Sequence, residues 1–394
     1  MSARSRLFIA LVSTALIGYI AIGSLLGRVL GDTSYGQLAV FNEVVRLVLE
    51  GYVEPVNLDR AMAGARLGLT DALDGDSAYL DADEWKLLQQ PGKDDADIGA
   101  VLTRRFGFLM VVAPRTGSPA EKAGLRTGDI LKTIDGHHTR PLAAASGQRM
   151  LRGAPGSSVK LTVLRAGVDP IEMSVVRERL VAAAPTSRIL EGGTGYLKMT
   201  ELSAKSADEA RTAVESLKRG GAKSLVLDLR GAAQSGPAEG VKVAELFMNG
   251  GVVAKVSSVK APEQILSAAP KGAVWEGPLA VLIDTGTSGA GEIVAAALHD
   301  ADRGPLVGER TFGRVGVQKQ LPLAEGGMIL TVARYVSPKG TAIHGQGVQP
   351  TVAVGSGPDD GSDEAPAPTP VPGKDPILDK ALELLHSGEA KKAA

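Results

Sequence analysis

The sequence contains no cysteine, which excludes disulfide bonds, a catalytic thiolate, cysteine-ligated metals and lipid attachment to a cysteine. Aromatic residues are scarce, at 4% of the chain. Acidic and basic residues almost cancel to a net charge of −1, so we expect no nucleic-acid partner. Among the five histidines only His137 and His138 are adjacent, and no set has the spacing of metal ligands. We therefore expect no metal site, and we assign no other cofactor.

A long uncharged stretch lies near the N-terminus. Arg4 and Arg6 precede Leu7–Gly27, which is long enough to cross a bilayer as a helix. A positive start before an apolar run is also typical of a secretory signal, and Gly23 ends an acceptable cleavage site. We predict a transmembrane anchor or a signal segment over residues 7–30 and favour the anchor. Either leaves the bulk of the chain in the periplasm or on the extracellular side, and cleavage would make the protein secreted.

Four further regions differ in pattern. Apolar residues at helical spacing predict an N-terminal helical segment over residues 36–92, with a turn at Asp74–Tyr79. Proline, glycine and aspartate predict a disordered linker at residues 355–374, and an amphipathic pattern predicts a closing helix at residues 375–386. Residues 194–353 alternate between strand and helix patterns, which predicts a largely parallel sheet with any site in its loops.

Within this alternating region, Leu279–Ile283 reads as a buried strand and Ile293–Leu298 as part of a helix. The turn between them, Thr285–Glu292, consists mostly of small residues. Such a turn places a group at a helix N-terminus, where free N–H groups and the helix dipole favour an oxyanion. Earlier in the region, Ser206–Glu209 has the pattern of a capping box that opens a helix.

Residues 97–180 form a β-rich unit that resembles a PDZ domain. The match is almost letter for letter over Ser118–Gly136, and Val159–Arg165 alternates like a strand. The resemblance implies that a protein C-terminal peptide adds to the domain as an extra strand. It places the carboxylate-binding loop at Ile98, Gly99, Ala100 and Val101. The alternative is a domain that only packs against its neighbour.

The turn Gly286–Glu292 resembles the nucleophile turn of the carboxyl-terminal processing (tail-specific) serine peptidases, roughly Gly-Ser-Ala-Ser-Ala-Ser-Glu. Gly308–Gln318 resembles the family's lysine motif, Gly-Glu-Lys-Thr-Phe-Gly-Lys-Gly-x-Val-Gln, and Leu73–Leu80 resembles its Leu-Asp-x-x-Ser-x-Tyr-Leu element. The resemblance implies an α/β (α+β multidomain) protein. It would have a crotonase-like β/α peptidase core at residues 181–354, an inserted PDZ domain and an N-terminal helical segment.

Both residues of the catalytic dyad are substituted. The two motifs place the family's serine at Gly289 and its lysine at Arg314, with the separation that the family has, while Gln318 is retained. Glycine has no hydroxyl, and arginine does not deprotonate in proteins, so neither residue can perform its role. Arg314 could instead clamp a carboxylate or form a structural ion pair, and we favour the ion pair.

The loop that helps to form the family's oxyanion hole is also altered. The family reads Arg-Asn-Asn-Pro-Gly-Gly, whereas this chain has Arg230 followed by Gly231, Ala232, Ala233, Gln234 and Ser235. Ser288 and Lys319 adjoin the dyad positions, but a shift of one helical residue turns a side chain by about 100°. We therefore interpret Ser288 as a turn or cap residue.

Three functions remain open. The first is a membrane-tethered, catalytically inactive pseudopeptidase that binds protein C-terminal tails through its PDZ domain as an adaptor or regulator. The second is a serine-type endopeptidase that cleaves near C-termini with Ser288 and Lys319 as a non-standard dyad. The third is a structural subunit of a homo-oligomer or of an active paralogue. We favour the first, because three parts of the catalytic site have changed together.

Overall fold

The computed structural model describes residues 36–90, 96–355 and 374–387 and divides into two units, Met1–Ala65 and Arg66–Ala394. In the first unit, residues 36–51 are helical and α2 (Leu58–Asp71) begins. No helix among the described residues is long and apolar enough to cross a membrane. The expected anchor or signal segment, residues 7–30, lies outside the described residues, as does nearly all of the expected linker at residues 355–374.

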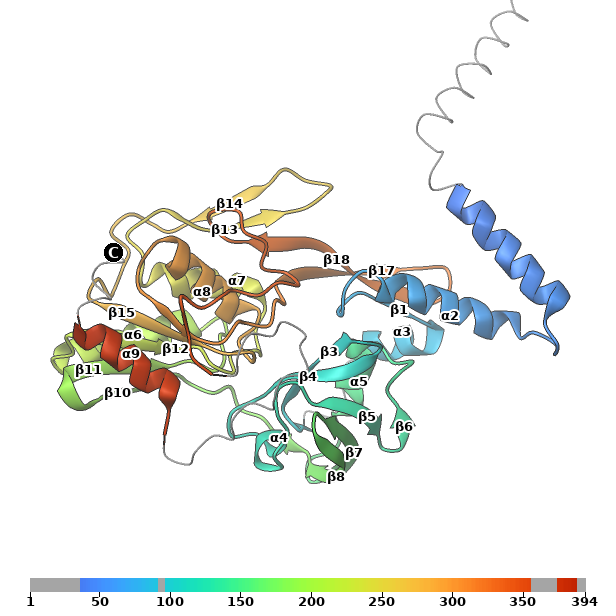
Figure 1. Ribbon diagram of the computed structural model, residues 1–394, viewed down its shortest axis with the longest axis horizontal. Coiled ribbons are helices and arrows are strands. Elements are labelled where there is room, and N and C mark those ends of the chain that lie inside the picture. Colours follow the sequence, from blue (N-terminus) through green and yellow to red (C-terminus); the bar gives the residue numbers. More distant parts are fainter. Residues whose placement is uncertain (1–35, 91–95, 356–373, 388–394) are drawn as a thin grey trace, which may run out of the picture. The chain divides into compact units, whose positions relative to one another are not determined.

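The second unit contains a six-stranded sheet in the order β10-β11-β12-β15-β16-β19. Figure 1 labels β10, β11, β12 and β15 among these strands. Its strands are β10 (Thr186–Ile189), β11 (Thr194–Lys198), β12 (Ser224–Asp228), β15 (Leu279–Ile283), β16 (Leu306–Gly308) and β19 (Val352–Ala353). All neighbours are parallel except β10, which pairs antiparallel with β11. The largely parallel α/β core predicted from the alternating pattern is therefore present.

Both faces of this sheet are covered, which explains why its strands read as continuous apolar runs. On β12, Leu225 and Leu227 share one core with α6 (Ser206–Arg219), α7 (Pro237–Glu245) and α8 (Ala290–Asp300). Val226, between them, packs instead with the closing helix α9 (Pro376–Ser387). The capping box predicted at Ser206–Glu209 is wrong, because the Ser206 hydroxyl accepts the Ser203 N–H and Lys205 is the N-cap.

A second, antiparallel sheet has the order β1-β18-β13-β14, with β17 also paired to β18. It consists of β1 (Ala78–Leu80), β18 (Gly327–Val336), β13 (Val252–Ser257), β14 (Gln264–Ser267) and β17 (Gly316–Pro322). The predicted turn at Asp74–Tyr79 is correct only in its first part, since Ala78 already pairs with Ile329. This pairing ties the segment before α3 (Ala82–Gln89) to the peptidase core.

The PDZ unit is a sheet in the order β3-β4-β5-β7-β8, with β6 paired to β5. Its elements are β3 (Ala100–Arg105), β4 (Phe108–Pro114), α4 (Pro119–Lys122), β5 (Ile130–Ile134), β6 (His137–His138), α5 (Ala144–Met150), β7 (Ser158–Arg165) and β8 (Val168–Val176). A short pair, β2 (Ala96–Asp97) with β9 (Glu178–Arg179), flanks it. Strand β3 is an edge of the sheet, and α5 lies against it (Figure 1).

Candidate functional site

The turn between β15 and α8 holds a glycine in a conformation that other residues rarely adopt. Gly289 is the N-cap of α8, with φ of 58° and ψ of −115°. Only glycine takes up such a backbone without strain. A Cβ at this position would also collide with the carbonyl oxygen of Ser235, and it would lie 3.8 Å from the carbonyl oxygen of Arg314. The two dyad positions are therefore adjacent, as the motifs predict, but a side chain at residue 289 has no space.

The altered loop fills the N-terminus of α8. The Ser235 carbonyl accepts the N–H of Ala290 at 3.4 Å, and the Ser235 hydroxyl accepts the N–H of Leu202 at 2.9 Å. One residue of the loop is thus bonded to two separate segments. A carbonyl oxygen of the chain itself lies at the helix end where a peptidase would stabilise an oxyanion.

Glu292 ties the nucleophile turn to the segment that contains Arg314. Its side chain is 0% exposed. One carboxylate oxygen accepts the Thr311 hydroxyl at 2.6 Å and the Gly313 N–H at 2.5 Å, and the other accepts the N–H groups of Gly289 at 3.0 Å and Arg314 at 2.7 Å. Burial raises the pKa of Glu292 to about 6, and the four hydrogen bonds oppose that rise. This carboxylate fixes both dyad positions through their backbones.

The Arg314 side chain forms the structural ion pair that we favoured. Its Nε donates to the two carboxylate oxygens of Asp76 at 2.9 and 2.7 Å. Asp76 is 7% exposed and Arg314 is 31% exposed, so the pair is largely shielded from water. Within the described parts of the chain the terminal nitrogens of Arg314 have no hydrogen-bond partner. Asp76 belongs to the Leu73–Leu80 element, and no role was predicted for it.

A cavity of about 400 Å³ adjoins these residues. Its walls include Arg314, Gln318, Gln234 and Ser235. The Gln318 amide donates to the Thr331 hydroxyl at 3.4 Å, and the Gln234 Nε2 is buried without a partner among the described residues. The cavity thus retains the glutamine of the family motif, while the two dyad positions beside it, Gly289 and Arg314, supply neither a nucleophile nor a base.

The substitute dyad is not assembled. The Ser288 side chain is 1% exposed, and its hydroxyl has no hydrogen-bond partner among the residues that the structure describes. Lys319 lies on β17, is exposed, and does not line the cavity. A general base must be within hydrogen-bond reach of the group that it activates. In this structure Lys319 is out of reach of Ser288.

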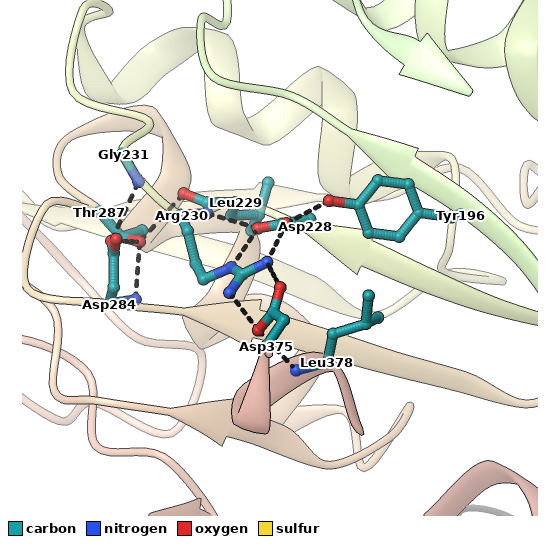
Figure 2. A network of polar contacts seen from close by, with 9 residues as sticks. All are labelled: Tyr196, Asp228, Leu229, Arg230, Gly231, Asp284, Thr287, Asp375 and Leu378. Atoms are coloured by element: carbon teal, nitrogen blue, oxygen red, sulfur yellow. Dashed lines mark hydrogen bonds and ion pairs between the residues drawn. The ribbon is translucent and has the colours of Figure 1, made fainter. Parts of the chain in front are cut away.

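The altered loop starts from a partly buried network of charges (Figure 2). Arg230 donates to both carboxylate oxygens of Asp228 at 2.9 and 2.7 Å and to both oxygens of Asp375 at 2.8 Å. The Tyr196 hydroxyl donates to Asp228 at 2.6 Å. Burial opposes the charge of Arg230, but its hydrogen bonds to the two aspartates hold its pKa above the ordinary value. Burial next to Asp228 raises the pKa of Tyr196, so its phenol stays a donor.

A second part of this network joins the altered loop to the nucleophile turn (Figure 2). Asp284 accepts the N–H of Gly231 at 3.0 Å and the hydroxyl of Thr287 at 2.9 Å. The single hydrogen of the Thr287 hydroxyl is shared with the Leu229 carbonyl, whose oxygen lies 3.0 Å from the hydroxyl. The first residue after Arg230 and the residue two before Gly289 are therefore fixed to one carboxylate. Burial raises the pKa of Asp284.

Asp375 connects the closing helix to Arg230 and also caps that helix, since it accepts the Leu378 N–H at 3.0 Å. We expect Asp375→Ala to lower the free energy of unfolding by about 1–2 kcal/mol, mostly through the lost cap because Asp375 is 37% exposed. Urea unfolding measures the change. Lys380→Ala removes the exposed ion pair with Glu383 on the same helix and should change stability by less than about 0.5 kcal/mol. Equal effects of the two variants would contradict the role of Asp375.

A second cavity, of about 330 Å³, lies beside the loop predicted to hold a carboxylate, and Gln234 of the altered loop also lines it. Gly99, Ala100 and Val101 line it, whereas Ile98 is fully buried in the PDZ core. Arg115 and Arg152 also line it. Arg115 donates to Glu201 at 2.5 Å, and the more exposed Arg152 lies 3.4 Å from Asp97. The predicted loop therefore forms one wall of a cavity that is also lined by two arginines and by Asp97.

Comparisons with known proteins agree with this architecture. Residues 193–354 match the family model of peptidase family S41, and residues 110–165 match that of the PDZ domain. The carboxy-terminal processing protease CtpA of Bacillus subtilis (strain 168) is 30% identical over 351 residues, which cover 88% of this chain and 75% of that protein. A carboxy-terminal-processing protease of Bartonella bacilliformis is 31% identical over 331 residues, covering 82% and 76%.

Among solved structures, the photosystem II D1 C-terminal processing protease superposes with a TM-score of 0.67 at 27% identity. The superposition covers 77% of this chain and 84% of that structure. The chain belongs to the carboxy-terminal processing protease family. The family and the fold class predicted from the motifs are confirmed.

Some residues around the site were missed by the sequence reasoning. Asp76 and the carbonyl of Ser235 had no predicted role, although both lie in segments that were singled out. Glu292 was used only as the last residue of the nucleophile-turn motif, and no hydrogen bond was predicted for it. Its presence three residues after an N-cap position is a capping signal that could have predicted its bond to Gly289.

Proposed function

We propose that this protein is a pseudopeptidase that binds the C-terminal tails of proteins through its PDZ domain without cleaving them, as an adaptor or regulator. The observation that carries the proposal is the geometry at Gly289. The nucleophile position has no side chain, and the Ser235 carbonyl occupies the space that a side chain would need. A serine peptidase requires a hydroxyl in this place and a base beside it.

The surroundings of the missing dyad support the same conclusion. Arg314 cannot act as a base, and its guanidinium is held in an ion pair with Asp76. Ser288 is buried without a base in reach. The alternative of an active endopeptidase would need Ser288 to turn toward the cavity and Lys319 to leave its exposed position.

Peptide binding is supported by the PDZ unit. Strand β3 is an edge of its sheet, which is the position at which a peptide strand adds. Beside it lies the cavity with Arg152, whose guanidinium could pair with a terminal carboxylate. The apolar part of the cavity lining comes from Ala96, Ala100, Val101 and Leu180. These walls favour a tail that ends in a small apolar residue such as alanine or valine.

We also propose that the protein is tethered to a membrane, with its bulk outside the cytoplasm. This part of the proposal rests on the sequence of residues 7–30. Membrane fractionation followed by a carbonate wash tests it. An anchored chain stays in the pellet, whereas a chain of lower mass in the soluble extracytoplasmic fraction would mean a cleaved signal.

Fluorescence anisotropy tests the binding function. We expect fluorescein-labelled ten-residue peptides that end in valine or alanine to bind saturably. The same peptides with an amidated C-terminus should bind about tenfold more weakly or worse, because they lose a charge-assisted contact. Equal binding of acid and amide would contradict carboxylate recognition. Absence of binding by both would leave the structural-subunit function as the better account.

A further inference from the structure

A side-chain amide of the PDZ helix occupies the edge of β3. The Gln148 Nε2 donates to the Ala100 carbonyl at 2.8 Å, and the Leu102 N–H donates to the Gln148 Oε1 at 3.1 Å. One amide therefore satisfies an outward C=O and the next outward N–H of an edge strand. These are the two kinds of group with which an added peptide strand pairs.

The orientation of this amide follows from its partners. If its oxygen and nitrogen were exchanged, a donor would face the Leu102 N–H and an acceptor would face the Ala100 carbonyl, so both hydrogen bonds would be lost. The helix that carries Gln148 also lies close to the sheet. A Cβ on the preceding residue, Gly147, would collide with the side chain of Leu109. The small residue thus permits the close approach that brings Gln148 onto the strand.

We infer that Gln148 is an internal competitor for peptide in the PDZ groove. An incoming tail can pair with Ala100 and Leu102 only after the Gln148 amide has turned away and given up both hydrogen bonds. This inference rests on the proposed function, since it describes how the same peptide site is regulated. It adds a cost to binding that a chain without this amide does not have.

The position of Gln148 gives the displacement a second consequence. Gln148 lines both the PDZ cavity and the cavity at Arg314, together with Val101 and Gln234. The two cavities meet at this side chain. Turning it away joins them along β3, so a bound tail can extend from the carboxylate loop toward the former catalytic site.

The test compares peptide affinity between wild type and Gln148→Met, which keeps the length of the side chain but removes its hydrogen bonds. The probe is the fluorescein-labelled ten-residue peptide that ends in valine with a free carboxylate. We expect its Kd to fall about tenfold in the variant, because binding no longer replaces two neutral hydrogen bonds. Gln148→Ala should show the same direction. Thermal unfolding checks that both variants are folded, and Arg149→Met, at an exposed position of the same helix, is the control.

The outcomes separate the two levels of the proposal. Tighter binding by both Gln148 variants and not by the control supports the internal competitor. Binding by the Gln148 variants that equals or is weaker than that of wild type overturns the internal competitor but leaves the proposed function unchanged. An equal gain in affinity in the Arg149→Met control has the same meaning. Absence of binding by wild type and all variants contradicts the proposed function itself and the competitor with it.

Discussion

Replacing Glu292 with glutamine is expected to lower the free energy of unfolding by about 3–5 kcal/mol. The carboxylate accepts four hydrogen bonds, two on each oxygen: three come from backbone N–H groups, which can only donate, and one comes from the Thr311 hydroxyl. The amide of glutamine has a single acceptor oxygen, so its NH₂ would face two of these donors. At least one buried backbone N–H group would then lose its partner without access to water.

The matched control is Glu215→Gln, which makes the same chemical change at an exposed position of α6. Its effect should stay within about 0.5 kcal/mol. Urea unfolding of the two variants and wild type at pH 7 measures both values. A loss at residue 292 no larger than that of the control would show that Glu292 does not hold the two dyad segments together.

The same substitution should change how stability depends on pH. The pKa of Glu292 rises from an ordinary value of 4.5 to about 6 in the folded chain. Between these values the folded state retains a proton that the unfolded state has released, so this group makes stability fall as pH increases. The loss amounts to about 2 kcal/mol. The difference in unfolding free energy between wild type and Glu292→Gln should therefore shift by this amount between a pH well below 4.5 and a pH well above 6. A constant difference would contradict the raised pKa.

Restoring the dyad alone is expected not to restore cleavage. Gly289→Ser would place a side chain on a backbone with φ of 58° and against the Ser235 carbonyl. We expect it to lower the free energy of unfolding by about 2–4 kcal/mol. In Gly289→Ser with Arg314→Lys, the new lysine would also lie beside Asp76, whose negative charge keeps an ammonium protonated. Mass spectrometry of a valine-ended peptide should find no shortened product.

The control is Gly236→Ser, directly after Ser235, where a Cβ meets no other atom within 4 Å. Gly236 is the N-cap of α7, with φ of −68°, and serine is a good N-cap residue, so stability should be unchanged or slightly higher. Cleavage by the double variant would mean that only the dyad was lost. If cleavage appears only after residues 231–235 are also replaced by Asn-Asn-Pro-Gly-Gly, the loop is shown to block the site.

Much of the fold could be predicted from the sequence because it depends on local patterns. The buried strand Leu279–Ile283 and the helix after it follow from hydrophobicity and from small residues in the turn. The adjacency of Gly289 and Arg314 could be predicted because the two motifs lie at the same sequence separation as the serine and lysine motifs of the family. The strand Ala78–Leu80 could not, since its three residues become a strand only by pairing with a segment far along the chain.

The hydrogen bonds and ion pairs of the site could not be predicted either, because they also depend on contacts between segments that are far apart in the sequence. The sequence gives Asp76 and Arg314 as two charged residues, but their contact depends on the packing of segments that are far apart. The position of the Ser235 carbonyl is a property of loop conformation and leaves no signal in residue type. Gln148 lies on a predicted PDZ unit, yet its bond to β3 depends on how closely α5 approaches the sheet.

In the described part of the chain, a group of the protein itself bonds to each of the two expected ligand sites. At the nucleophile turn, the Ser235 carbonyl accepts the N–H of Ala290. At the edge of β3, the Gln148 amide pairs with Ala100 and Leu102. In each case a group of the chain itself occupies a position that a substrate would use. The two differ in one respect, because a side chain can turn away without a change in the backbone, whereas a carbonyl cannot.

The most direct test of this account follows binding and cleavage in one sample. The full chain is incubated with the valine-ended, free-acid peptide at a concentration that saturates the anisotropy signal, and peptide mass is followed for hours beside a Ser288→Ala control. The account predicts saturable binding and a peptide that keeps its full length. Shortened peptide that appears with wild type and disappears with Ser288→Ala would contradict it, because the chain would then be a working peptidase.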